Sequence, residues 1–353
     1  MKTGFPIYGE PSSGIGRLLF NVEFDRKDTI EGYLIPDGFS DQSSILVTRD
    51  DGTVVSFPCD QPRPAVVQSG RHATGIVGFR IDESRMPDLA SQRRLAIQDA
   101  KTGLLIYRRP PVDEPVELKL LRLELNIVPM AKFDAYCGGN FQYAISAVER
   151  FGHETTMQAF HLHAHKSIYI SGRLLLRNYE EFLDNGFQAI ADMPDPYYEM
   201  ACRLFILKRL AKGPVTFLGD RDRLILTPAS EHFAEVNLDD DKAVNRALKK
   251  ASDKARGVLI SPITRQLVCT YPEQRVTRRD IAAAIGTLSR FKVVGHEGDH
   301  MHFQQAIGEL LSLPPMNIPV IPRYSLLEEL AMRLRQMPVV RAAVQKSSTV
   351  AAG

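Results

Sequence analysis

A change of pattern near residue 112 constrains the fold of this 353-residue chain more than any other feature. Before it, short β-rich segments with period-two alternation follow one another, and no window shows a convincing helical period. Asp51-Gly52 lies between two such segments and favours a tight hairpin turn, and Lys101-Thr102-Gly103 is similar to a second hairpin turn. The pattern predicts a small all-β sandwich over residues 1–112. The expected strands cover residues 16–24, 29–35, 44–49, 53–58, 74–82 and 94–107.

After a proline-rich linker at residues 109–115, apolar strands alternate with amphipathic helices. Such alternation is typical of an α/β layer fold with a largely parallel sheet. We therefore expect an α/β domain over residues 113–346 and a disordered tail over residues 347–353. The expected strands are 141–148, 167–171, 187–191 and 291–294, and the expected helices are 197–210, 242–255, 278–288, 303–313 and 326–337.

Composition restricts the classes of partner. Lys and Arg number 44 against 42 Asp and Glu, so the net charge of +2 argues against nucleic-acid binding. No apolar run is long enough to cross a bilayer, and no charged-then-apolar segment begins the chain. The four cysteines lie far apart without a CxxC spacing, which favours reduced, buried thiols. We expect a cytoplasmic protein without nucleic-acid partners and without membrane insertion.

The stretch at residues 149–156 follows an expected strand and opens an expected helix. A loop with a glycine before a helix can bind phosphate through its backbone N–H groups. Arg150 would supply positive charge and Thr155 or Thr156 a hydroxyl, whereas Glu154 would oppose an anion. From these residues alone, an anion site and a plain strand-to-helix turn both remain open.

Six of the nine histidines fall in two short stretches, residues 161–165 and 296–302. His296, Glu297 and His300 formally match HExxH, which leaves a zinc-dependent hydrolase as a remote alternative. Gly298 and the preceding strand instead favour a loop-to-helix junction. We expect no metal at either stretch.

The order of these pieces over residues 116–338 resembles the bacterial sulfotransferase family. Residues 149–155 stand where that family has PK-x-G-x-T-S/T between a strand and a helix. Arg150 stands at the position of the sulfate-contacting lysine, and Gly152 and Thr155 match the motif.

Later motifs follow at similar spacing. Residues 171–173 (Ser-Gly-Arg) precede residues 193–196 (Met-Pro-Asp-Pro) as the family's SGH precedes its LRDP. Residues 291–297 are similar to the family's final strand-to-helix motif. The N-terminal strands are similar to modules found beside such domains in polysaccharide loci.

The resemblance implies a P-loop-like, three-layer sulfotransferase-type fold preceded by the β-sandwich. It implies transfer of sulfate from 3′-phosphoadenosine 5′-phosphosulfate to a glycan hydroxyl in bacterial surface-polysaccharide biosynthesis or modification. Carried over position by position, the resemblance assigns catalysis to Arg150 and cofactor binding to Arg150, Gly152, Thr155, Arg173 and Cys202. The family's catalytic base has no direct counterpart, so Glu154 and His153 are the candidates that would substitute for it, and Thr156 is a further candidate for cofactor binding through its hydroxyl.

Several positions depart from the family pattern. Pro194 and Cys202 replace the arginine and serine that bind the nucleotide 3′-phosphate, and Arg173 replaces the histidine of SGH. Losing a charge-assisted contact to a buried phosphate costs on the order of 2–4 kcal/mol. Two functions therefore remain: a divergent active sulfotransferase, or a catalytically inactive sulfotransferase-like binding or scaffold subunit. Its partners would be a glycan and other proteins of polysaccharide assembly.

Overall fold

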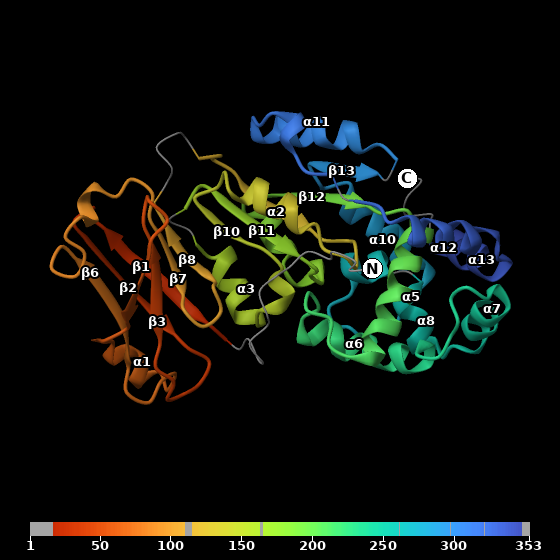
Figure 1. The fold of residues 1–353 in the computed structure, drawn as a ribbon, viewed down its shortest axis with the longest axis horizontal. Helices are drawn as coiled ribbons and strands as arrows, with labels where there is room; N and C mark the ends of the chain where they lie inside the picture. Colours follow the sequence, from red (N-terminus) through yellow and green to blue (C-terminus); the bar gives the residue numbers. More distant parts are fainter. Residues whose placement is uncertain are drawn as a thin grey trace. The chain divides into compact units, whose positions relative to one another are not determined.

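The computed structural model describes residues 17–109, 115–162, 165–260, 262–296, 298–320 and 322–347 (Figure 1). The chain divides into two compact units. We call residues 17–119 and 137–170 the β unit, and residues 120–136 and 171–347 the α/β unit.

Two antiparallel four-stranded sheets account for the N-terminal strands. Their orders are β1-β2-β6-β5 and β4-β3-β7-β8. Residues of β2 and β3 alternate between buried and half-buried, as expected for sheets with one face in a core. The elements are β1 Leu19–Asp25, β2 Thr29–Ile35, β3 Ser44–Thr48, β4 Val54–Pro58, β5 Gln61–Pro62, α1 Pro64–Gln68, β6 Ile76–Asp82, η1 Leu89–Ser91, β7 Ala96–Asp99 and β8 Leu105–Arg108.

Both predicted hairpin turns are confirmed. Strands β3 and β4 pair with Thr48 opposite Val54, and Gly52 in the turn has a φ of +82°. The expected strand 94–107 is a hairpin of β7 and β8, and Gly103 in its turn has a φ of +71°. Glycine adopts these positive φ values without the steric penalty of a Cβ atom.

The segment 137–170 belongs to the β unit. The ring of Phe20 in β1 stacks on Tyr143 with centroids 6.3 Å apart. The Thr155 hydroxyl accepts a hydrogen bond from the Leu18 N–H at 2.9 Å and donates one to the Leu18 carbonyl at 3.0 Å. These contacts tie the segment to β1. Its elements that lie wholly within the segment are β10 Tyr143–Ile145, η2 Val148–Arg150 and α3 His153–Phe160.

A five-stranded parallel sheet has the order β10-β11-β9-β12-β13, which confirms the predicted α/β class. Strand β9, the first of the five in the chain, is central. Strands β10 and β11 lie on one side of it, and strands β12 and β13 lie on the other. The chain therefore leaves β9 and its neighbour β12 in opposite directions, and α/β proteins commonly bind their ligands outside the carboxyl ends of the strands at such a switch point. The remaining strands are β9 Lys119–Leu123, β11 Ile168–Gly172, β12 Phe187–Met193 and β13 Val293–His296.

Helix α5 is the longest helix of the α/β unit and begins where the sequence predicts. Asp195 caps it by accepting hydrogen bonds from the N–H groups of Tyr197 and Tyr198 at 2.8 and 2.9 Å, and Pro196 is its first residue. Helices α6 and α12 pack on α5 (Figure 1). The helical elements are α2 Ala131–Gly138, η3 Leu176–Asn178, α4 Glu180–Asp184, α5 Pro196–Lys212, α6 Asp220–Phe233, α7 Asp241–Lys250, α8 Asp253–Leu259, α9 Pro262–Val268, α10 Arg278–Leu288, α11 His300–Leu311, η4 Pro315–Asn317, α12 Ser325–Gln336 and α13 Pro338–Ser347.

Two expected elements differ from the structure. The single helix expected over residues 242–255 is two helices, because the Ser252 hydroxyl accepts a hydrogen bond from the Ala255 N–H at 3.2 Å and starts α8. The strand expected over residues 141–148 ends at Ile145, since Ala147 has a positive φ of 54° before η2.

Other expectations concern the termini and linker. The centre of the expected linker, residues 110–114, and the tail after residue 347 lie outside the described residues. The four cysteines are buried and form no disulfide. Among the described helices, none combines the length and apolar character that a membrane span requires.

The packing of α12 gives the first prediction. Leu334 is fully buried in this helix, whereas Met332 on the same helix is 60% exposed. Leu334→Ala should lower the free energy of unfolding by about 2–5 kcal/mol because it leaves a cavity. Met332→Ala is the matched control and should change it by less than about 0.5 kcal/mol. Urea unfolding followed by circular dichroism measures both, and equal effects would contradict this packing of α12.

Candidate functional site

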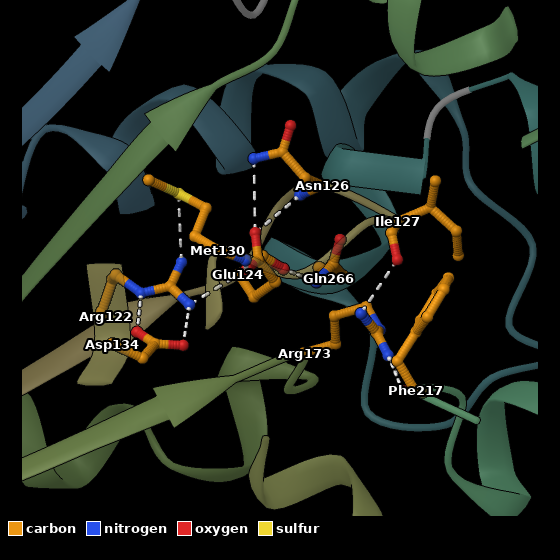
Figure 2. Close-up of polar contacts among 9 residues, drawn as sticks. All are labelled: Arg122, Glu124, Asn126, Ile127, Met130, Asp134, Arg173, Phe217 and Gln266. Carbon is orange, nitrogen blue, oxygen red and sulfur yellow. Dashed lines mark hydrogen bonds and ion pairs between the residues drawn. The ribbon is translucent and has the colours of Figure 1, made fainter. Parts of the chain in front are cut away.

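A buried arginine lies at the carboxyl end of β9. Arg122 donates through Nε and Nη2 to the two carboxylate oxygens of Asp134, at 2.5 and 2.6 Å (Figure 2). Its Nη2 also donates to Glu124 Oε2 at 2.9 Å. All three side chains are at most 3% exposed. Because buried charges are tolerated only when they are paired, these contacts compensate the guanidinium fully.

The Glu124 carboxylate is also held by the loop that joins β9 to α2. Its Oε1 accepts a hydrogen bond from the Asn126 N–H at 3.1 Å, and its Oε2 accepts one from the Met130 N–H at 2.8 Å (Figure 2). Backbone N–H groups between a strand and a helix are the donors that commonly bind phosphate. Here two of them bind a carboxylate of the chain itself.

A second carboxylate reaches the same loop from α5. The Ile127 N–H donates to Glu199 Oε1 at 2.9 Å, and Arg203 Nε donates to the same oxygen at 2.7 Å. Burial raises the pKa of Glu199 to about 7, although Arg203 and the Ile127 amide favour its charged form. The loop therefore binds two internal carboxylates.

Arg173, a predicted cofactor ligand, follows β11. Its Nη2 donates to Asp222 Oδ2 at 2.8 Å. Its Nη1 donates to the Ile127 carbonyl at 3.2 Å (Figure 2). Arg173 is 4% exposed. It therefore holds the β9 loop against α6, and its charge is paired within the chain.

Asp192, on β12, is the unusual carboxyl of this edge. It is 5% exposed, and its Oδ1 has no hydrogen-bond partner among the described residues. Burial raises its pKa to about 6, while the charges of His300 and Arg122 oppose that shift and Glu124 reinforces it. A carboxyl with a pKa near 6 can accept a proton at neutral pH, which is the property of a general base.

Gly295, on β13, lies against this carboxyl. A Cβ atom at Gly295 would lie 2.6 Å from Asp192 Oδ1, so only glycine leaves room for the side chain. The edge of β9 and β12 thus combines a paired arginine, two carboxylates bound by a loop, and one unpartnered carboxyl.

The predicted phosphate loop at residues 149–156 has the expected strand–loop–helix order. Gly152 is the N-cap of α3, and Arg150 ends the short helix η2 before it. Strand β10, which precedes this loop, is an edge strand of the five-stranded sheet. The loop therefore does not follow either strand of the switch point.

The side chains of that loop serve local structure. The hydroxyl of Thr155 is hydrogen-bonded to the backbone of β1, and that of Thr156 donates to the Gly152 carbonyl at 3.3 Å. Glu154 forms ion pairs with Arg17 at 3.5 Å and with Arg71 at 3.7 Å. His153, the first residue of α3, is exposed.

The predicted site residues fall in two units. Arg150, Gly152, His153, Glu154, Thr155 and Thr156 belong to the β unit, and Arg173 and Cys202 belong to the α/β unit. Cys202 is buried in the hydrophobic core around α5, at 4% exposure.

The HExxH-like stretch forms the junction that the sequence predicts. His296 ends β13 and His300 begins α11, so the two histidines do not share one helix as a zinc protease requires. Glu297 and His163 lie outside the described residues. Within the described part of the chain, no cluster of side chains could hold a metal ion.

Sequence reasoning missed Arg122, Glu124, Asp134, Asp192 and Glu199. A usable signal was present, because Arg122, Glu124 and Asp192 interrupt or end apolar strands, where charged residues are rare.

Comparison of the chain with protein-family models, with curated proteins and with solved structures finds no match in any of the three. The resemblance to sulfotransferases therefore stays a prediction.

The raised pKa of Asp192 gives the second prediction. Its folded-state pKa of about 6 exceeds the ordinary 3.8, so stability falls as the pH rises from about 4 to 6 and the penalty then remains. At pH 8, Asp192→Asn should raise the free energy of unfolding by about 3 kcal/mol relative to the natural protein, measured by urea unfolding. At pH 4 it should leave the free energy of unfolding unchanged. Asp239→Asn, at an exposed position, is the control. A gain that is the same at both pH values would show that Asp192 ionises normally.

Proposed function

We propose that this protein is a sulfotransferase-like subunit of bacterial surface-polysaccharide assembly that binds its partners in the cytoplasm without transferring sulfate. One observation supports the loss of transfer. The three buried arginines among the described residues of the α/β unit, Arg122, Arg173 and Arg203, are each paired with a carboxylate of the same chain.

The residues present do not fit 3′-phosphoadenosine 5′-phosphosulfate at the switch-point edge. The amides of the β9 loop are hydrogen-bonded to Glu124 and Glu199, and Pro194 offers no donor where the family has an arginine. Two unit charges of one sign about 4 Å apart repel by about 4 kcal/mol at an effective dielectric constant of 20. A phosphate beside Glu124 would therefore bind about 1000-fold more weakly than at a neutral loop.

An active, divergent sulfotransferase is the second candidate. The strand–loop–helix order from β10 to α3, with Gly152 at the N-cap, favours it. In that case Arg150, His153 and Glu154 would face the donor, and a glycan hydroxyl would be the acceptor.

Titration of adenosine 3′,5′-bisphosphate separates the two candidates and is the third prediction. Isothermal titration with the full chain should detect no binding up to about 1 mM nucleotide, because the internal carboxylates repel it. Micromolar binding that Arg150→Ala abolishes, and that the exposed control Arg341→Ala preserves, would overturn the proposal in favour of the active enzyme, whose transfer of sulfate a screen of acceptors would then measure.

A further inference from the structure

A cavity of about 360 Å³ is lined by residues of the edge strand β1 and of the end of α3. Its lining belongs wholly to the β unit, and its size is within the range of small-molecule sites. It is lined by Asn21, Val22, Phe24, Asp25, Tyr33, Tyr107, Gln158, His161, Leu162 and His165.

A β-bulge shapes this lining. Asn21 pairs with Tyr33, but Phe24 pairs with Glu31, because Glu23 is an extra residue in β1. In a regular strand Phe24 would point to the face opposite Asn21. The bulge returns Phe24 to the face of Asn21 and Tyr33, and re-aiming a side chain in this way is common beside binding sites.

One wall of the cavity is rigid. Arg109 donates to both oxygens of Asp25, at 2.7 and 3.0 Å, and the Tyr107 hydroxyl donates to the same carboxylate at 3.0 Å. Burial opposes the charge of Asp25, but the hydrogen bonds from Arg109 and the Lys27 N–H lower its pKa below the ordinary value. Asp25 therefore stays ionised and fixed in position.

Four of the other polar side chains are uncommitted. The side chains of Asn21, Tyr33, Gln158 and His165 form no hydrogen bond with any described residue, and all four are half-buried. They present amide, hydroxyl and imidazole groups around the half-buried ring of Phe24, one face of which lies under the guanidinium of Arg26, with Cζ 4.7 Å from the ring centroid. Such groups match the hydroxyls of a sugar, and an aromatic face packs against its C–H groups.

The charge of the lining selects among sugars. No lysine or arginine is among the described residues that line the cavity, and Asp25 is negative. Burial, with a contribution from Lys119, lowers the pKa of His165, so its imidazole is neutral at pH 7. The charge of Asp25 is paired with Arg109, so an anionic sugar would find no cation among the described lining residues to balance its own charge.

We propose that this cavity binds an uncharged pyranose unit of a glycan, held by Asn21, Gln158 and the ring of Phe24. The inference takes the glycan partner from the proposed function but depends on a different unit of the chain.

To test this proposal, the full-length protein is titrated with the methyl glycosides of glucose, galactose, mannose and N-acetylglucosamine. Saturation-transfer NMR detects the binding of each glycoside. At least one neutral glycoside should bind with a millimolar or tighter dissociation constant. Asn21→Ala and Gln158→Ala should each weaken binding about fivefold, the loss of one hydrogen bond, and Phe24→Ala should weaken it about tenfold. Methyl glucuronide should bind more weakly than the neutral glycosides.

Matched controls lie on the same unit. Gln42→Ala and Phe39→Ala remove an exposed amide and a 57% exposed ring away from the cavity, and should leave binding unchanged. Circular dichroism verifies that each variant is folded. The proposal is overturned if no neutral glycoside binds at about 20 mM, if glucuronide binds equally well, or if binding survives Asn21→Ala and Phe24→Ala together. The nucleotide titration is independent, so either proposal can fail without the other.

Discussion

The bidentate pairing of Arg122 with Asp134 organises the carboxyl edge of the central strand β9. A buried guanidinium without partners would cost several kcal/mol, so the pairing fixes the start of α2 against β9. The same guanidinium orients Glu124, whose carboxylate then binds the amides of the β9 loop. One buried cation thus determines the conformation of the loop where an α/β protein normally binds its ligand.

The consequence is a switch-point edge that carries its own anions. Glu124 and Glu199 accept the hydrogen bonds that a phosphate would otherwise receive, and the charge of Arg173 is paired with Asp222. A negatively charged donor would have to displace these carboxylates. The bulged edge of β1 is different. The side chains of Asn21, Tyr33, Gln158 and His165 form no hydrogen bond with any described residue, and no lysine or arginine is among the described lining residues. We infer that recognition by this protein uses neutral polar surfaces rather than phosphate sites.

Local signals predicted many elements well, and tertiary contacts explain the rest. Helix α10 begins and ends as predicted, because Asp280 accepts hydrogen bonds from the N–H and hydroxyl of Thr277 within one turn. A glycine and two hydroxyls, all visible in the sequence, predict the phosphate loop at residues 149–156. The pairing of Arg122 with Asp134 joins residues twelve positions apart, across the loop between β9 and α2. Only the folded structure shows that the amides of this loop are bound by a carboxylate of the chain itself.

The most direct test of this account measures whether the resident carboxylate keeps anions out. Glu124→Gln removes one negative charge and leaves the contact between Arg122 and Asp134 in place. The melting temperature would be measured with and without about 10 mM pyrophosphate, since a ligand that binds only the folded state raises it. The account predicts no stabilisation of the natural protein and a clear rise for the variant. Equal stabilisation of both proteins would contradict it.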